Sequence, residues 1–550
     1  MPFYIYIPFF KSSNNPRLTR AKELHRAREY DPTTHAYTFQ DIRYAKPPTG
    51  DLRFRAPQSP EVDRSSIQVG HHPRTCPQGM PRWQALGGAV ASKWADPSRQ
   101  FDMDEWVADF YTTNITAKDY NEGPGGVSED CLFLDVRVPK RMLKAASRGK
   151  KKLAPVLVWI HGGGYDLGSK QRFPSPQFIP TGLLSKGNKG PEGMIYVAMN
   201  YRLGAFGWLS GLEVERDGDL NAGLLDQRLA LEWIQQYIHL FGGDKNRVTV
   251  MGESAGAGST LLHTMAYGGD TSRSPTPFSQ IIPQSPFIEP TSVPVESTLE
   301  KFLSMLNVSS LQEARQIDEK TLVAVNAELI RTAPANTYLF GPVIDKKYIP
   351  ERPMKMLREG RFNKSVEILT THTSFERGYF FDPSVEMEEE FREWINLTIP
   401  GLTEETIEYL AEELYLPEFD GSWGYTSQAT RQMSLWGEAF FDCNFVEIGD
   451  ASDGQAYAGE FGLSPGFHTQ DLAYTFDFPG APVPFAQTKD FWQNAIVSFT
   501  RTGKPEIGDG SEFPKWGSQG LLVNMTETKS YVAVNRVNKT RCDWWAQVDL

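Results

Sequence analysis

The sequence predicts an α/β protein with a large, mostly parallel central sheet and helices on both faces of the sheet. Short apolar runs alternate along the 550 residues with longer stretches typical of helices, which is the order of β-α-β units. Strands are predicted at 155–160, 194–199, 248–251, 279–283, 365–370 and 455–461. Helices are predicted at 224–241, 255–265, 296–306, 402–414, 425–440 and 487–501.

A serine between two glycines follows the predicted strand 248–251. The run GESAG at 252–256, with Ser254 at its centre, has the form of a nucleophile elbow, a sharp strand-to-helix turn that exposes the serine hydroxyl. So tight a bend leaves room only for glycines beside the serine. Taken alone, the pattern also fits an ordinary glycine-rich turn.

A second glycine run lies upstream, where strand 155–160 leads directly into HGGGY at 161–165. Consecutive glycines leave backbone N–H groups unshielded, as an oxyanion hole requires. A phosphate-binding loop does not fit, because no Gly-Lys-Ser/Thr follows and the run carries no lysine or arginine. Together the two runs predict an acyl-transfer enzyme whose oxyanion hole is formed by Gly163, Gly164 and Ala255.

At these residues the chain resembles the type-B carboxylesterase/lipase family, the cholinesterase-like α/β-hydrolases, and the likeness extends over residues 36–550. The resemblance implies the α/β-hydrolase fold with a lid insertion, and ester hydrolysis through a covalent acyl-enzyme. The other segments that carry it are FQDIRYAKPP at 39–48, SEDCLFLDV at 128–136, NAGLLDQ at 221–227, FGGD at 241–244, FGPVID at 340–345 and RTGKP at 501–505.

A serine hydroxyl needs a base to take its proton and a carboxylate to orient that base. In this fold the order along the chain is serine, acid, histidine. Of the nine histidines, only His372 and His468 follow Ser254 outside the helical segments that flank the elbow. The segment PGFHTQDL around His468 resembles the catalytic-histidine loop of the family, so His468 is the predicted base.

The resemblance places the acid at Glu376, which aligns without a gap. The family has glycine after its acid, whereas this chain has Arg377. A cation beside the carboxylate favours the ionised form, so the departure is compatible with the role. Asp345 is the alternative acid, although a structural role in a turn after a buried strand is the better interpretation of this residue.

Two further residues match family positions that contact and support the catalytic serine, histidine and acid. Glu253 precedes the serine, and Ser285 lies in PQSP at 283–286. Ordinary packing roles explain both residues equally well.

No low-complexity linker divides the chain, so one domain is expected over 29–550, with residues 1–28 unassigned. The interval between Cys76 and Cys131 is longer than in typical cholinesterases, and in related secreted lipases the loop with this disulfide forms a mobile lid. Two interpretations of residues 77–130 remain: a mobile lid, or a static surface excursion that is packed by its own aromatic residues. A short amphipathic helix is expected at 104–110.

None of the four cysteines has C-x-x-C spacing, which argues against a zinc site. The resemblance implies the disulfides Cys76–Cys131 and Cys443–Cys542. Disulfides indicate an oxidising compartment, and N-x-S/T sequons agree with the secretory pathway. The N-terminal run MPFYIYIPFF lacks the basic region and cleavage site of a signal peptide, so a reduced intracellular protein is the alternative. The sequons are at Asn114, Asn307, Asn363, Asn396, Asn524 and Asn538.

The formal net charge of −12 argues against nucleic acid and anionic membranes as partners. No apolar run approaches the roughly 20 residues of a membrane span. The expected partner is a small-molecule ester, with no metal or organic cofactor, and the oligomeric state is undefined. Two alternatives stay open: acyl transfer or lactone formation with an alcohol in place of water, and a non-catalytic cholinesterase-like adhesion module.

Overall fold

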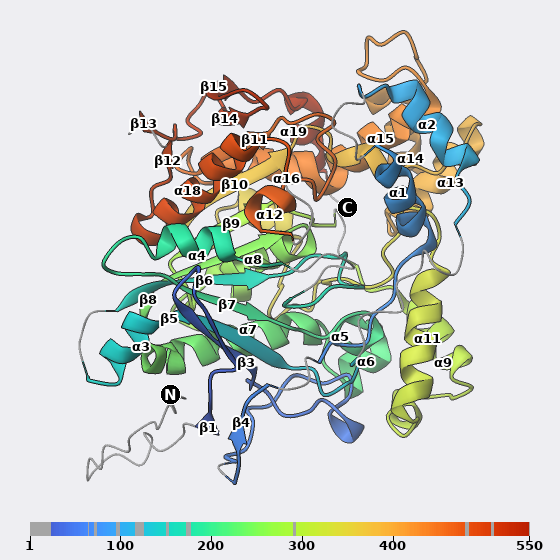
Figure 1. The fold of residues 1–550 in the computed structure, drawn as a ribbon. Helices are drawn as coiled ribbons and strands as arrows, with labels where there is room; N and C mark the ends of the chain where they lie inside the picture. Colours follow the sequence, from blue (N-terminus) through green and yellow to red (C-terminus); the bar gives the residue numbers. More distant parts are fainter. Residues whose placement is uncertain are drawn as a thin grey trace.

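The computed structural model describes residues 24–63, 65–70, 74–94, 100–115, 126–149, 153–171, 178–289, 293–478, 483–507 and 511–548. Its centre is an eleven-stranded sheet (Figure 1). In spatial order the strands are β15 (Ser530–Val534), β14 (Leu521–Met525), β11 (Tyr457–Phe461), β10 (Glu367–Thr373), β9 (Gln280–Gln284), β8 (Gly243–Glu253), β6 (Ala154–Ile160), β7 (Ile195–Met199), β5 (Phe133–Pro139), β3 (Ala36–Arg43) and β2 (Glu29–Asp31).

The predicted fold class is confirmed. Every neighbouring pair from β14 to β7 is parallel, and antiparallel strands are added only at the two edges. All six predicted strands lie in the parallel part, as β6 to β11. The carboxyl ends of parallel strands meet at one edge of a sheet, which is where α/β proteins bind ligands.

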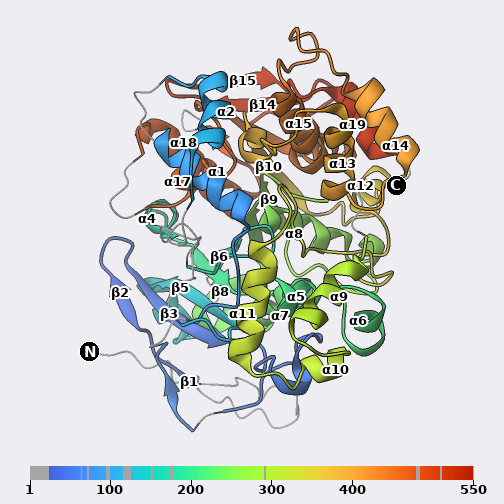
Figure 2. The same cartoon turned by 90° about the vertical axis from the view of Figure 1, so that its right-hand side faces the viewer.

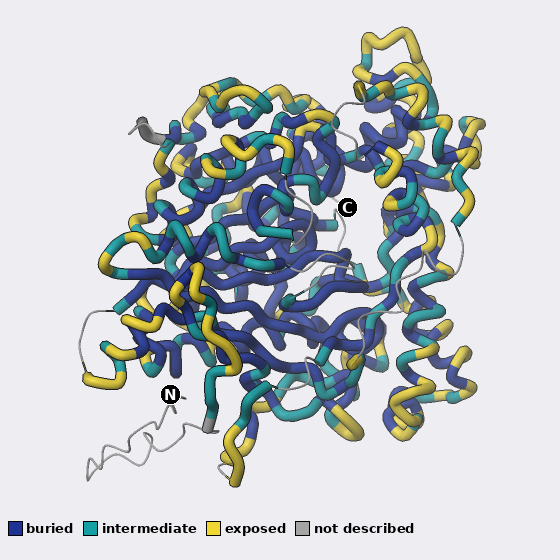
Figure 3. Tube along the Cα trace, viewed as in Figure 1, coloured by how far each residue is buried: buried dark blue, intermediate teal, exposed yellow. Residues whose placement is uncertain are grey.

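The sheet is buried on both faces, as β6 shows most clearly. Val156 and Val158 belong to one hydrophobic cluster, whereas Leu157 and Trp159 belong to another on the opposite face. Side chains alternate along a strand, so an apolar run with no polar position supplies both cores. The central strands β6, β7 and β9 are accordingly buried throughout (Figure 3).

Helices cover both faces, as predicted. The cluster that contains Val156 also receives apolar side chains from many helices, including the five given next, and the cluster that contains Trp159 receives them from three. The first group is α7 (Ala222–Tyr237), α8 (Ala255–Met265), α12 (Pro353–Arg358), α16 (Cys443–Ala451) and α19 (Lys539–Gln547). The second is α4 (Thr181–Gly187), α17 (Leu472–Thr475) and α18 (Ala486–Thr502).

Two predicted helices are interrupted. The stretch 402–414 forms α14 (Glu404–Tyr409) and then a π-turn at Leu410–Leu414. The stretch 425–440 forms α15 (Gln428–Gly437), and a second π-turn at Glu438–Asp442 joins α15 to α16. Such π-turns inside helices often occur at functional sites.

The interval between Cys76 and Cys131 carries α1 (Arg82–Lys93) and α2 (Met103–Thr112), and its residues 95–99 and 116–125 lie outside the described residues. α2 confirms the helix expected at 104–110. Both helices lie beside α15 (Figures 1 and 2). Their aromatic residues form a cluster with Phe375 and Phe467, so the excursion packs against other parts of the chain as well as against itself.

The N-terminal segment left unassigned falls mostly on residues 1–23, which are outside the described residues. β1 (Leu24–His25) pairs with β4 (Ile67–Gln68) in a separate small sheet. Across the described parts of the chain, no helix has both the length and the apolar character needed to cross a bilayer.

Candidate active site

Ser254 lies on the turn between β8 and α8, with φ 56° and ψ −124°. A positive φ is uncommon for a residue with a side chain and holds the serine at the apex of the bend. The flanking glycines are required by contact: a Cβ on Gly252 would lie 2.4 Å from the Gly256 carbonyl group, and one on Gly256 would lie 2.2 Å from the Ile160 oxygen. The GESAG run therefore has the geometry of a nucleophile elbow.

The structure brings the three predicted triad residues together. His468 Nε2 lies 2.9 Å from Ser254 Oγ, and His468 Nδ1 lies 2.6 Å from Glu376 Oε2. With the proton on Nδ1, the ring donates to the carboxylate and Nε2 is free to accept from the serine hydroxyl. Because Ser254 follows β8, Glu376 follows β10 and His468 follows β11, all three come from the carboxyl edge of the sheet.

Glu376 is held in its ionised form. Burial alone would raise the pKa of this carboxyl, but the charge and hydrogen bond of His468 outweigh burial and leave the pKa below its ordinary value. The Thr373 amide also donates to Glu376 Oε1 over 2.6 Å. Ser285 lies near enough to lower the pKa further, although its hydroxyl meets hydrogen-bond geometry with no described residue.

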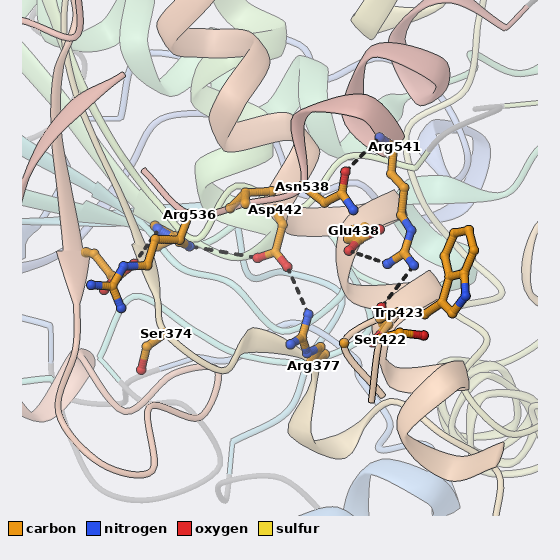
Figure 4. A pocket seen from close by; sticks show the side chains of 14 residues that line it. Ser374, Arg377, Ser422, Trp423, Glu438, Asp442, Arg536, Asn538 and Arg541 are labelled. Carbon is orange, nitrogen blue, oxygen red and sulfur yellow. Dashed lines mark hydrogen bonds and ion pairs between the residues drawn. The ribbon is translucent and has the colours of Figure 1, made fainter. Parts of the chain in front are cut away.

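Arg377, which replaces the glycine of the family pattern, points away from the hydrogen-bond relay formed by Ser254, His468 and Glu376. Its guanidinium lies 3.9 Å from Asp442 Oδ2 (Figure 4), and its side chain packs over Gly437, where an added Cβ would come within 2.6 Å of the Arg377 Cβ. The absence of a side chain at Gly437 makes room for the arginine.

The alternative acid, Asp345, is not near His468. Its carboxylate accepts hydrogen bonds from the Asn221 side chain and from the Lys347 and Ile349 amides. Asp345 is therefore a turn residue. His372 is also outside the relay, because its ring faces Asp442 and Glu460.

The glycine loop lies against the elbow. β6 pairs with β8, and a Cβ on Gly162 would lie 3.0 Å from the Ser254 Cβ. Gly163 and Gly164 both have positive φ and line the same cavity as Ser254 and His468. Ala255 begins α8, so its N–H belongs to the first turn of the helix, where amides are unpaired.

Glu253 lies behind the relay, with Oε1 3.4 Å from His468 Nε2. Burial, followed by the charges of Asp471 and Glu376, raises the pKa of Glu253 well above its ordinary value. A carboxyl with a raised pKa keeps its own proton more readily, which weakens its competition with Glu376 for the histidine proton.

A cavity of about 330 Å³ opens above Ser254 and His468. One wall is α1, which presents Ala85, Gly88 and Ala89 to the cavity at helical spacing, followed by Ser92. These small side chains leave the cavity wide on that side. Aromatic side chains complete the lining, with Trp83 from the start of α1 and Tyr338, Tyr379 and Phe380 from other segments.

Tyr338 and Asp471 are among the residues of the site that were not predicted. The Tyr338 ring would lie 1.9 Å from a Cβ on Gly164, so it closes directly over the glycine loop. Asp471 is buried three residues after His468 and accepts from Gln284 Nε2 over 2.7 Å, and burial followed by the Glu376 charge raises its pKa to about 6. Asp471 lies inside the segment quoted for His468, but Tyr338 gave no signal in the sequence.

Both disulfides form as the resemblance implies, Cys76 with Cys131 and Cys443 with Cys542. The first closes the base of the excursion, and the second joins α16 to α19. Among the described residues, no group of three His, Cys, Asp or Glu side chains could hold a metal ion.

Comparison with known proteins agrees with this geometry. Residues 26–545 match the carboxylesterase family. The chain is similar to Carboxylesterase patB of Penicillium expansum, at 37% identity over 96% of this chain and 94% of that protein. It is also similar to a secreted triacylglycerol lipase of Gibberella zeae, at 38% identity over 43% of this chain and 35% of that protein. Aspergillus niger EstA shares the fold, with a TM-score of 0.74, 23% identity and coverage of 96% of each chain.

Proposed function

The chain belongs to the carboxylesterase family and is a carboxylic-ester hydrolase, and we propose that it works through an acyl-enzyme on Ser254, with His468 as base and Glu376 as acid. The observation that carries the proposal is the pair of short contacts that link Ser254, His468 and Glu376 at the floor of a cavity.

In the first step, Ser254 Oγ attacks the ester carbonyl carbon while its proton passes to His468 Nε2. The imidazolium that forms is stabilised by Glu376 across the 2.6 Å contact. The carbonyl oxygen becomes an oxyanion, which the N–H groups of Gly163, Gly164 and Ala255 stabilise. Collapse of this intermediate breaks the ester C–O bond, and His468 gives its proton to the departing alcohol.

In the second step, water attacks the acyl-enzyme. His468 takes a proton from the water as the oxygen bonds to the carbonyl carbon, and returns it to Ser254 Oγ as the carboxylic acid leaves. An alcohol in place of water would give acyl transfer or a lactone by the same route. Acyl transfer to an alcohol is the second candidate function.

A non-catalytic adhesion module does not need the hydrogen-bonded residues Ser254, His468 and Glu376. Such a module keeps the fold while losing the serine or the histidine, whereas Ser254 and His468 are both present and 2.9 Å apart here. The relay therefore favours an enzyme.

We propose one domain over 29–550, with 77–130 as a lid over the cavity. The family match across residues 26–545 supports the single domain, and α1 supports the lid because it forms one wall of the cavity. The proposed substrate is a small-molecule ester that lies against Ala85, Gly88 and Ala89. The two disulfides and the secreted lipase relative support a secreted protein.

The experiment that tests this assignment compares four proteins on a short chromogenic ester. Ser254→Ala should lower kcat/KM roughly 10⁴-fold or more, and Glu376→Gln should cost somewhat less. Asp345→Asn, which keeps the size of the turn residue, should be close to wild type. A collapse at Asp345→Asn with little effect at Glu376→Gln would move the acid to Asp345.

A further inference from the structure

The imidazole ring of His161 lies at the start of the glycine loop, residues 161–165, and is fully buried. Its Nδ1 lies 2.9 Å from the carbonyl oxygen of Gly162. Burial lowers the pKa of His161 to about 4, so the ring is neutral over the ordinary pH range. A neutral ring carries one proton and a carbonyl oxygen can only accept, so Nδ1–H donates to Gly162.

This hydrogen bond fixes the direction of one proposed oxyanion donor. The Gly162 carbonyl and the Gly163 N–H belong to one trans peptide group, which is planar, so they point in opposite directions. Because the carbonyl is held towards the His161 ring, the Gly163 N–H points away from that ring. Gly163 lines the cavity above Ser254, and its N–H donates to no described residue.

The second glycine donor is oriented in the same way, by backbone groups. The Gly163 carbonyl shares a peptide group with the Gly164 N–H and accepts from the Asp166 and Leu167 amides over 3.0 and 3.1 Å. Each proposed glycine donor is thus oriented through the carbonyl of its own peptide group. Among the hydrogen bonds of the described residues, only that of the first donor involves a side chain, the His161 ring.

The position of the His161 ring is set by Tyr201 and Gly168. The ring stacks on the Tyr201 ring, with centroids 4.4 Å apart and an interplanar angle of 16°. The Tyr201 hydroxyl also donates to the His161 carbonyl over 2.6 Å. A Cβ on Gly168 would lie 2.4 Å from His161 Nδ1, so the close approach at this nitrogen requires a glycine. These contacts fix the ring where Nδ1 reaches Gly162.

We propose that His161 is a positioning residue, which orients the Gly163 N–H towards the oxyanion and makes it a stronger donor. The inference rests on the proposed function, because the oxyanion forms only when Ser254 attacks an ester carbonyl. A peptide group whose carbonyl accepts a hydrogen bond is polarised, so its N–H donates more strongly. The oxyanion exists in the transition state and not in the bound substrate, so His161 affects kcat and leaves KM nearly unchanged.

The test compares His161→Asn with His161→Leu on a short chromogenic ester. Both substitutions remove the ring, and the two new side chains have nearly the same shape, but only the amide carries an N–H donor near the place of Nδ1. Rates are expressed per active site, counted from the final amount of fluorophosphonate label on Ser254. His161→Leu should lower kcat about tenfold or more, less than the roughly 10²–10³-fold cost of a whole oxyanion donor. His161→Asn should keep most of the wild-type kcat.

A transition-state analogue gives a second measurement on the same proteins. A trifluoromethyl ketone forms a tetrahedral oxyanion with the serine, so its inhibition constant should rise in His161→Leu by the factor that kcat falls. Equal kcat in the two variants, or a loss confined to KM, would overturn the inference while leaving the acyl-enzyme mechanism intact. Absence of label on Ser254 in wild type would refute the proposed function, and the inference with it.

Tyr201→Phe tests the inference independently, even where neither His161 variant folds. It keeps the stacked ring but loses the hydrogen bond to the His161 carbonyl, so kcat should fall about threefold or more at unchanged KM. The matched control is Tyr44→Phe, because Tyr44 is also buried and donates to the Asn200 carbonyl over 2.6 Å, outside the glycine loop. Its kcat should equal that of wild type. Equal losses of kcat in Tyr201→Phe and Tyr44→Phe would contradict the inference.

Discussion

Trp106 of α2 donates its indole N–H to the carbonyl oxygen of Gly378 over 2.8 Å, two residues beyond Glu376. The same ring stacks on Phe467, the residue before His468, with centroids 4.2 Å apart. One fully buried side chain of the excursion thus contacts both loops that deliver the acid and the base.

This contact predicts that Trp106 holds the excursion closed. Trp106→Phe keeps most of the packing but loses the hydrogen bond, which should lower the free energy of unfolding by about 1 kcal/mol. Amide exchange across 103–112 should accelerate, since mobile loops come from the less stable parts of a fold. Hydrogen-exchange mass spectrometry measures this directly.

The matched control for that exchange is Trp94→Phe. Trp94 donates its indole N–H to Asp109 over 2.9 Å, within the excursion itself, so its loss leaves the contact with Gly378 intact. If Trp106→Phe and Trp94→Phe accelerate exchange equally, the contact with Gly378 has no special part in closure.

The small side chains that α1 presents to the cavity predict a preference for the chain length of the ester. A Cβ on Gly88 meets no atom within 4 Å, so the position accepts a larger side chain without a clash at the Cβ. Gly88→Leu should fill part of the cavity and lower kcat/KM for long-chain esters much more than for acetate esters. Gly88→Ala is the control, because it raises helix stability by about 1 kcal/mol while adding one methyl group. An identical chain-length profile in Gly88→Leu would place the substrate elsewhere.

The raised pKa of Glu253 predicts an unusual pH dependence of stability. The folded protein binds this proton more tightly than the unfolded chain, so the residue destabilises the fold increasingly as pH rises above the ordinary glutamate pKa. Glu253→Gln removes that penalty. Denaturant unfolding should show the variant more stable than wild type at neutral pH, with the difference vanishing near pH 4. If the difference in the free energy of unfolding between variant and wild type is the same at every pH, the pKa of Glu253 is not raised in the folded protein.

The disulfide between Cys443 and Cys542 should contribute more to stability than the one between Cys76 and Cys131. The sequence separations are 99 and 55 residues, and the chain-entropy model gives the longer loop roughly 4–5 kcal/mol, about 0.5 kcal/mol more than the shorter. Replacing each pair with alanine and measuring denaturant unfolding tests the order. The opposite order would show that strain or residual structure outweighs loop length.

The sequence predicted the centre of this protein better than its edges. β6 and the second half of β8, at 248–251, are short apolar runs next to glycine motifs, so their type and the chemistry at their ends were evident. The outer strands β3, which is next to the edge, and β15, which is at the other edge, carry polar or exposed positions. β3 also has a register shift between Phe39 and Ile42, which hides its periodicity.

The site was predicted to the extent that its residues lie in local motifs. Ser254, His468 and the glycine loop each have one, and Glu376 was found through the resemblance in spite of Arg377. Tyr338 and Trp106 could not be found, because their roles depend on contacts with Gly164 and Gly378 that only the folded chain creates.

The most direct test of the central claim is the rate at which an alkyl fluorophosphonate labels the protein, followed by intact mass and peptide mapping. Only a serine activated by a neighbouring base reacts quickly. Wild type should take up one equivalent on the peptide that contains Ser254. The labelling rate of His468→Ala should be lower than that of wild type by roughly 10³-fold or more. Label on another residue, or a near-native rate in His468→Ala, would contradict the assignment of Ser254 and His468 as nucleophile and base.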